Sequence, residues 1–197
     1  MAREDAHAPR HIRPGTIGCV EISAVGSDRA ASLYPIFLDA TPHHPDAPDR
    51  GFLLSGYSES DFEAFLERST VYGAFASAAF VGFVVVEAVA FERLDSITWH
   101  LSTEELRILE AMDLVWIRML AVLPQVARRG IGTALYHRLY QEYESTGLLT
   151  GLYEHPLDNR ASRRFHLQLG FSRIGESRLR RDGEPMVWRT GIYYRLA

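Results

Sequence analysis

The chain has 197 residues, of which 47% are hydrophobic and 23% charged, and its formal net charge is −4. Length and composition are those of one globular domain with a sizeable core, and the negative charge argues against a general nucleic-acid binder. The single cysteine, Cys19, excludes an internal disulfide, and we expect it to be a small core residue. No apolar run is long enough to span a bilayer and the first residues lack the apolar segment of a signal peptide, so we expect a soluble, cytoplasmic protein.

The beginning of the chain is predicted to be a loose arm followed by a strand and a helix. Residues 1–16 are polar and contain two prolines, so we expect an N-terminal arm, with residues 17–197 forming one domain. An apolar run over residues 17–23 predicts a first strand. A helix is expected over residues 27–38, interrupted or kinked at Pro35.

The next stretch changes from a proline-rich loop to a helix and a hairpin. Residues 41–51 contain three prolines together with His43 and His44. Adjacent side chains diverge in extended backbone and no further ligand set accompanies them, so we expect a loop and no metal site. Residues 58–61 open a second helix, and two apolar runs follow around a short turn at residues 77–78, as in a β-hairpin.

The middle of the chain contains an insertion and then a long strand–turn–helix unit. Residues 91–113 are expected to be an insertion with a short helix, which begins at the capping pair Ser102 and Glu105. Residues 114–123 predict a strand, and a helix is expected from residue 130 to 145 with Gly147 as its C-cap.

The last part of the chain predicts a strand over residues 148–154, a helix over 159–169 that Gly170 ends, and two final strands over 171–176 and 187–196. Asp182 and Gly183 are expected to form the turn between these last two strands. Together the elements predict a single α/β domain around a mostly antiparallel sheet.

The turn before the helix at residue 130 has the features of an anion-binding site. Free amides at a helix start carry the positive end of the helix dipole. Gly130 and Gly132 allow a tight turn and let a phosphate approach without meeting a Cβ, while Arg128 and Arg129 add positive charge. A dinucleotide-binding fingerprint would need a third glycine where Leu135 stands, and a phosphate loop would need a Gly-Lys-Ser/Thr that is absent.

Two segments resemble the motifs of one enzyme family. The strand–turn–helix at residues 115–135 resembles motif A of the GNAT acyltransferases, and residues 159–171 resemble the family signature Asn-x-x-Ala-x-x-Phe-Tyr-x-x-x-Gly-Phe. Three positions depart from the pattern: Ala127 replaces a glutamine or arginine, Ser162 replaces the small alanine, and His166 replaces the tyrosine. The order and spacing of the two motifs also match the family.

The resemblance implies a GNAT fold with acetyl-CoA as acyl donor. That fold is a mixed, mostly antiparallel twisted sheet flanked by helices, here with a helical insertion before the motif A strand. The motif A strand splays from the next strand, and the pantetheine arm lies in the gap. The residues implied to contact the coenzyme are Leu120, Ala121, Val122, Ala127, Arg128, Arg129, Gly130, Ile131, Gly132, Thr133, Asn159, Ser162 and Arg163.

The resemblance also implies a direct attack of an amine on the thioester, which needs a base and an acid. His166 takes the place of the family's tyrosine acid, and an imidazole with a pKa of about 6.5 can donate a proton near neutral pH; a packed polar residue without a chemical role is the alternative. We favour Glu154 as the base, with Glu87 as second choice and Arg118 as the ion-pair partner of one of them. His155 is a third, weaker candidate.

The sequence therefore predicts an N-acetyltransferase that moves an acetyl group to a primary amine of a small-molecule or amino-acid-like acceptor. A protein acetyltransferase acting on lysine or an N-terminus, and a non-catalytic CoA-binding sensor, remain as alternatives. We expect no metal, no nucleic acid and no membrane among its partners, and a homodimer stays open.

Overall fold

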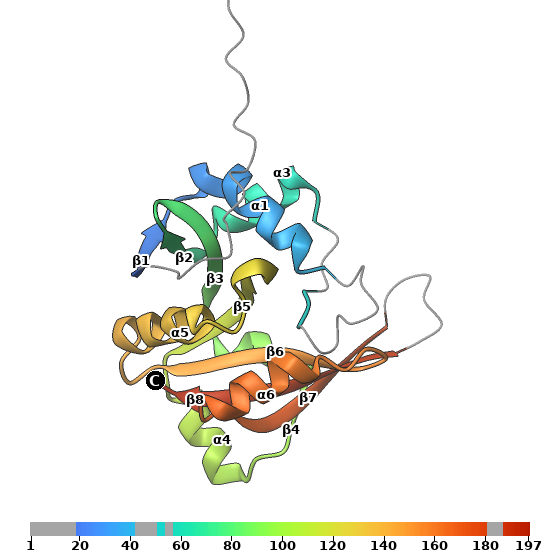
Figure 1. Ribbon diagram of the computed structural model, residues 1–197. Coiled ribbons are helices and arrows are strands. Elements are labelled where there is room, and N and C mark those ends of the chain that lie inside the picture. The colour runs from blue at the N-terminus through green and yellow to red at the C-terminus, as the bar shows by residue number, and fades with distance from the viewer. Residues whose placement is uncertain (1–18, 42–50, 54–56, 181–186) are drawn as a thin grey trace, which may run out of the picture.

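The computed structural model describes residues 19–41, 51–53, 57–180 and 187–197 (Figure 1). Its centre is an eight-stranded sheet with the order β1-β2-β3-β5-β6-β8-β7-β4, in which β5 and β6 are parallel and all other neighbours are antiparallel. The strands are β1 (Val20–Val25), β2 (Thr70–Ala76), β3 (Ala79–Val89), β4 (Ile97–Trp99), β5 (Leu114–Val122), β6 (Gly147–His155), β7 (Ser172–Arg180) and β8 (Val187–Leu196).

Helices cover both faces of this sheet. The α-helices are α1 (Ala30–Asp39), α3 (Glu59–Leu66), α4 (Thr103–Glu110), α5 (Ile131–Glu142) and α6 (Arg160–Gln168), with short 3₁₀ helices η1 (Ser27–Arg29), η2 (Phe91–Leu94) and η3 (Pro124–Val126). α5 and α6 pack on one face, around a core that includes Leu135, Leu139 and Leu148. The opposite face is covered by α1 and α3 over one half of the sheet and by η2 and α4 over the other.

Figure 1 shows α1 and α3 together above β3 and α4 at the far end, below β8. The face opposite α5 and α6 is therefore covered by two separate groups of helices. The two groups meet over the middle strands, because α1 and α3 pack on Met119 and Ala121 of β5, and η2 and α4 belong to the cluster of Leu114 of β5 and Leu149 of β6.

The α/β fold with a mixed, mostly antiparallel sheet is confirmed, and local signals placed most of its elements. Both predicted helix starts form capping boxes, in which Ser58 pairs with Asp61 and Ser102 pairs with Glu105. The hairpin turn occurs at Ser77 and Ala78, which both have positive φ. α1 continues through Pro35, so the expected interruption does not occur.

Expectations about two single residues were wrong, and one strand was missed. Gly147 does not cap α5, which ends at Glu142; it begins β6, where a Cβ would lie 2.7 Å from Leu114 Cδ2. Cys19 is exposed and does not belong to the core. The stretch 91–113 contains the expected helix but also strand β4, which was missed because three residues are too short for a periodic signal.

Several predictions fall on residues outside the described part of the chain. These are the arm over residues 1–16, His43 and His44, and the turn at Asp182 and Gly183. Among the helices that are described, none combines the length and the apolar character needed to cross a bilayer.

Candidate active site

The site begins where the two parallel strands separate. β5 and β6 pair from Leu114 opposite Gly147 up to Ile117 opposite Thr150, and both strands continue without pairing each other. At the same point β5 contains a β-bulge: consecutive β3 residues pair with Met119 and Ile117, which leaves Arg118 as the extra residue. A bulge bends its strand and increases the local twist. The gap between β5 and β6 therefore opens at Arg118.

The free edge of β5 presents backbone groups to this gap. The carbonyl of Ala121 faces β3, because it would lie 2.8 Å from a Cβ placed on Gly82. Neighbouring residues of a strand in an antiparallel ladder present their N–H and C=O groups to opposite sides. Leu120 and Val122 therefore present their N–H and C=O groups to the gap. Of the three residues predicted to pair with the coenzyme arm, these two can do so, and Ala121 cannot.

A cleft of about 2530 Å³ passes through the gap and reaches both faces of the sheet. On one face its lining includes the start of α5 and one side of α6. On the other face its lining includes the end of α1, η2 and the bulged part of β5. One ligand entering from each face would meet at the free edge of β5.

The start of α5 is built to bind an anion. Gly130 is the N-cap residue with φ 82°, and no side chain caps the helix. The first helical hydrogen bond runs from Ala134 N–H to Gly130 O. The N–H groups of Ile131, Gly132 and Thr133 therefore have no partner within the helix. A Cβ on Gly130 would have no atom within 4 Å, so a phosphate can approach these donors freely.

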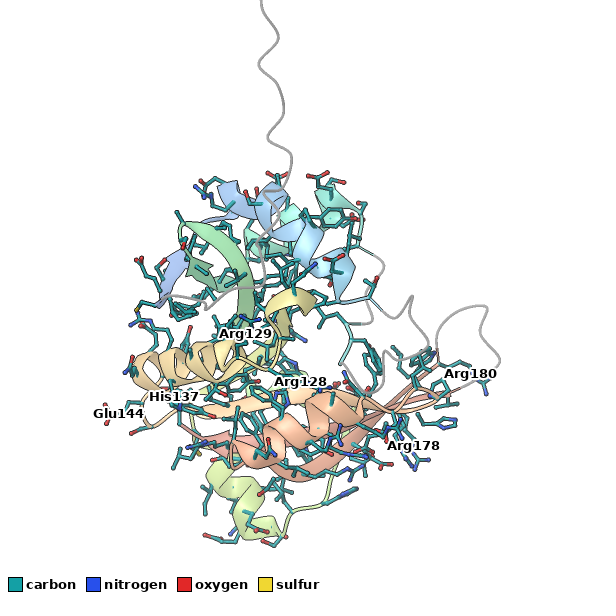
Figure 2. All side chains as sticks on the ribbon, in the orientation of Figure 1. Arg128, Arg129, His137, Glu144, Arg178 and Arg180 are labelled. Atoms are coloured by element: carbon teal, nitrogen blue, oxygen red, sulfur yellow. The ribbon has the colours of Figure 1, made fainter. Side chains whose placement is uncertain are left out.

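Two arginines lie directly before this helix start (Figure 2). Arg128 is exposed, lines the cleft and adopts a positive φ of 62°. Arg129 is exposed as well, and Ala127 lines the cleft beside them. Together with the free amides of α5, Arg128 makes this end of the cleft a strongly positive site for an anionic ligand.

Gly132 was expected to leave room for a phosphate, but its missing side chain leaves room for a neighbouring helix. A Cβ at this position would lie 3.2 Å from the Phe165 ring of α6. The missing side chain lets α6 pack closely against α5, so Gly132 and Phe165 join the two sequence motifs in space. The residue shapes the cleft wall through helix packing.

The arginines of α6 divide between structure and cleft. Arg163, the predicted coenzyme residue, forms an ion pair with Asp158 at 2.9 Å. Arg164 is exposed and lines the cleft on the same side as Arg128. Arg164 is thus better placed than Arg163 to meet a phosphate, a distinction that helical spacing alone did not make.

Asn159 and Ser162 organise the beginning of α6. Asn159 is buried, with its Oδ1 accepting a hydrogen bond from Ser162 N–H at 3.3 Å and its Nδ2 donating to Phe52 O at 2.9 Å. Leu53 N–H in turn donates to Ala40 O at 2.7 Å. The segment 51–53 therefore connects α1 with α6 across one end of the cleft, and the Asn159 side chain is engaged in holding it.

His166 is buried in a hydrogen-bonded pair with Tyr136. Its Nδ1 lies 2.7 Å from the Ser162 carbonyl, which can only accept, so the neutral ring carries its proton there. Nε2 then accepts a hydrogen bond from the Tyr136 hydroxyl at 2.5 Å. Burial lowers the pKa of His166 to about 4, against the hydrogen bond to Ser162, which raises it. This geometry argues against His166 as a proton donor to a thiolate, because near neutral pH its only proton is already donated.

Glu154 lies in an ion cluster beside the cleft. Its carboxylate, 8% exposed, accepts hydrogen bonds from Arg173 at 2.8 and 3.0 Å and from the Tyr193 hydroxyl at 3.2 Å, and Arg189 lies 3.4 Å away. Burial would raise the pKa of Glu154, but these partners, Arg173 above all, hold it below its usual value. Glu154 is held by two arginines and, unlike Glu87, is not among the residues that line the cleft, so the geometry argues against Glu154 as the base.

Glu87, the second choice, does line the cleft. Its Oε2 accepts a hydrogen bond of 2.6 Å from Arg118 Nε, and its Oε1 lies 3.1 Å from the Ser69 hydroxyl. The Glu87 side chain is 21% exposed and that of Arg118 is 41% exposed. β3 residues alternate in face, and Phe83 and Val85 pack with α1 and α3, so Glu87 lies on that face, opposite α5 and α6.

Residues 30–171, more than half of the chain, match the model of the acetyltransferase (GNAT) family. The chain belongs to the GNAT acetyltransferase family. Acetyl-CoA is the acyl donor of this family, and the free amides of α5, Arg128 and the open edge of β5 fit its phosphates and its extended arm.

Solved GNAT structures share the fold of this GNAT protein at low sequence identity. The ribosomal-protein-S18-alanine N-acetyltransferase of Escherichia coli is 19% identical, with a TM-score of 0.60 over 90% of this chain and 94% of that one. NAA60 of Arabidopsis thaliana with acetyl-CoA is 16% identical, with a TM-score of 0.63 over 91% and 100%. The IAA acetyltransferase of Bacillus cereus is 14% identical, with a TM-score of 0.56 over 91% and 100%. A comparison with curated protein sequences finds no match.

Proposed function

We propose that this GNAT protein is an N-acetyltransferase that moves an acetyl group from acetyl-CoA to the primary amine of a small-molecule or amino-acid-like acceptor by direct attack. The supporting observation is the gap between β5 and β6, which opens to an anion site on one face and to the Glu87–Arg118 pair on the other. The two ligands would enter from opposite faces and meet at the bulge.

On the coenzyme side, backbone groups provide most of the binding. The free amides at the start of α5 receive the pyrophosphate, and Arg128 and Arg164 add charge beside it. Leu120 and Val122 present N–H and C=O groups to the pantetheine amides, as a neighbouring strand would. This arrangement directs the thioester toward Arg118, where β5 bends away from β6.

On the acceptor side, Glu87 replaces Glu154 in our proposal. The amine nitrogen forms a bond to the thioester carbonyl carbon, the carbon–sulfur bond breaks, and the coenzyme leaves as thiolate. Glu87 attracts the acceptor amine and takes up its proton, directly or through one water. Arg118 and Ser69 hold the carboxylate in position for this step.

His166 has no part in this proton transfer. Its hydrogen bonds to Ser162 and Tyr136 connect the two helices that hold the coenzyme. The proton that the thiolate needs comes instead from the acceptor amine, relayed by Glu87 or solvent.

A small acceptor is favoured over a protein substrate by the segment 51–53. It crosses one end of the cleft and is hydrogen-bonded to α1 on one side and to α6 on the other. Phe52 is buried there and stacks against Tyr153, which also lines the cleft. A closed end suits a compact molecule better than a polypeptide that must pass through.

The proposal is tested by following free thiol release from acetyl-CoA with a panel of amines, amino acids and short peptides. Acetyl-CoA should raise the melting temperature, because a ligand at a hundred times its Kd adds about 2.7 kcal/mol to the free energy of unfolding. Glu87→Gln should lower kcat/KM by about 10²–10⁴-fold, whereas the exposed Glu92→Gln should match the parent. Coenzyme binding without turnover on any amine would show a sensor, and turnover on peptides alone would show a protein acetyltransferase.

A further inference from the structure

The arginines of this chain differ in how they are partnered. Seven arginines in the described part of the chain form ion pairs with carboxylates: Arg107, Arg118, Arg138, Arg163, Arg173, Arg178 and Arg189. Arg68, Arg93, Arg128 and Arg164 line the cleft, and in the described residues no hydrogen bond or ion pair engages their side chains. Unpartnered guanidinium groups concentrated in one cleft, on a chain of net charge −4, indicate anionic ligands.

Two of these four arginines are accounted for by the coenzyme. Arg128 directly precedes the free amides of α5, and Arg164 lies on the cleft side of α6. Both lie on the face that α5 and α6 cover, where the phosphates of acetyl-CoA are expected to bind.

The other two lie on the opposite face, around the acceptor site. Arg68 follows α3 and precedes Ser69, whose hydroxyl contacts Glu87. Arg93 belongs to η2, which is anchored by Leu94 in the same core cluster that Trp116 packs against. Arg68 and Arg93 thus line the same cleft as the Glu87–Arg118 pair, and they come from the two separate groups of helices on this face.

Among the described residues that line the acceptor end, positive charges outnumber negative ones. Among the described residues that line the cleft, the carboxylates are Asp39 and Glu87. Glu87 is already paired with Arg118 at 2.6 Å, and neither Arg68 nor Arg93 forms an ion pair with Asp39. In the proposed function Glu87 binds the amine of the acceptor, and the arginines leave an excess of positive charge among the described residues of this end of the cleft.

We infer that the acceptor carries, besides its primary amine, an anionic group, a carboxylate or a phosphate, which Arg68 and Arg93 bind. This inference rests on the proposed function, since it names the substrate class of the same site. A guanidinium binds either anion through paired N–H donors, and Glu87 at the other end of the acceptor receives its amine. The arrangement thereby orients the amine toward the thioester and discriminates against neutral amines.

Matched amines test this inference with the intact protein. Phenylalanine, phenylalanine amide and phenethylamine differ mainly in the carboxylate, and phosphoethanolamine and ethanolamine differ in the phosphate. The quantity measured is kcat/KM for the amine that carries the carboxylate or phosphate, divided by kcat/KM for the matched amine that lacks it. We expect this ratio to be at least ten in one of the two sets. The set that shows it identifies the anion as a carboxylate or a phosphate.

Arginine variants then locate the binding site. Arg93→Gln and Arg68→Gln should each reduce that ratio about 10–100-fold, the worth of a hydrogen-bonded charge. Arg107→Gln, which removes an exposed arginine of α4, should leave the ratio unchanged. Added salt should lower the ratio as well.

The outcomes separate this inference from the function on which it rests. Amines acetylated regardless of charge, or a ratio that Arg93→Gln and Arg68→Gln leave unchanged, would overturn the anionic acceptor but keep the acetyltransferase. Binding of acetyl-CoA with no acetylation of any amine would overturn the function itself.

Discussion

The buried imidazole of His166 makes the stability of this protein depend on pH in a range where carboxylates contribute little. The pKa of His166 is about 4 in the folded chain, because burial disfavours the charged ring, against an ordinary value of about 6.5. Between these values the unfolded chain binds a proton that the folded chain does not. The free energy of unfolding therefore falls as the pH falls from 6.5 toward 4.

The size of this effect follows from the two pKa values. The full difference corresponds to about 3 kcal/mol, of which about 2 kcal/mol is lost between pH 7 and pH 5. For a chain of this length, that loss lowers the melting temperature by about 4–8 °C. The remaining 1 kcal/mol is lost below pH 5, where partnered carboxylates such as Glu154 also begin to titrate.

The test compares two histidine-to-glutamine variants by thermal unfolding at several pH values between 7 and 5. His166→Gln keeps a side chain that can accept the Tyr136 hydrogen bond but does not titrate, so most of the pH dependence should disappear. His137→Gln, on the exposed side of α5, should keep the parental slope (Figure 2). If the melting temperature of His166→Gln depends on pH as steeply as that of the parent, burial does not hold the imidazole neutral. His166 would then again be a candidate for the catalytic acid.

Three further predictions concern the coenzyme site and its support. Arg164→Gln should weaken acetyl-CoA binding about tenfold by calorimetry, while Arg163→Gln should change it less, because Arg163 is engaged with Asp158; the reverse order would refute the assignment. Gly132→Val should destabilise the fold by about 1–3 kcal/mol in denaturant titrations, because its side chain would crowd the Phe165 ring. Asn159→Ala should cost about 1–2 kcal/mol, since it removes both a helix cap and the bond to the 51–53 segment; unchanged stability would show that neither bond matters.

Local signals in the sequence were enough for much of the fold. The capping pairs at Ser58 and Ser102 act within one helical turn, and the apolar runs of β3 and β5 reflect strands covered on both faces. The short strand β4 was not predicted because its three residues are stabilised by pairing with β7, from Ile97 opposite Ser177 to Trp99 opposite Gly175, far apart in the chain. Such a strand has no pattern of its own.

Site residues were predictable to the extent that backbone geometry defines them. The glycine turn before α5 predicts free helix amides from the sequence alone, and Arg128 next to this turn lines the cleft. Spacing along α6 could not distinguish Arg163 from Arg164, because the distinction depends on Asp158 lying within 2.9 Å of one of them.

The sequence by itself determined the family and the anion site, because both depend on the order of strand, turn and helix and on groups of the main chain. Only the tertiary structure shows which partners surround the candidate carboxylates and the candidate imidazole. Glu154 and His166 stand at the right positions in the chain, but Arg173 and Tyr136 reach them from other elements. A side chain's basicity depends on its burial and its partners, and these come together only when distant segments fold against one another.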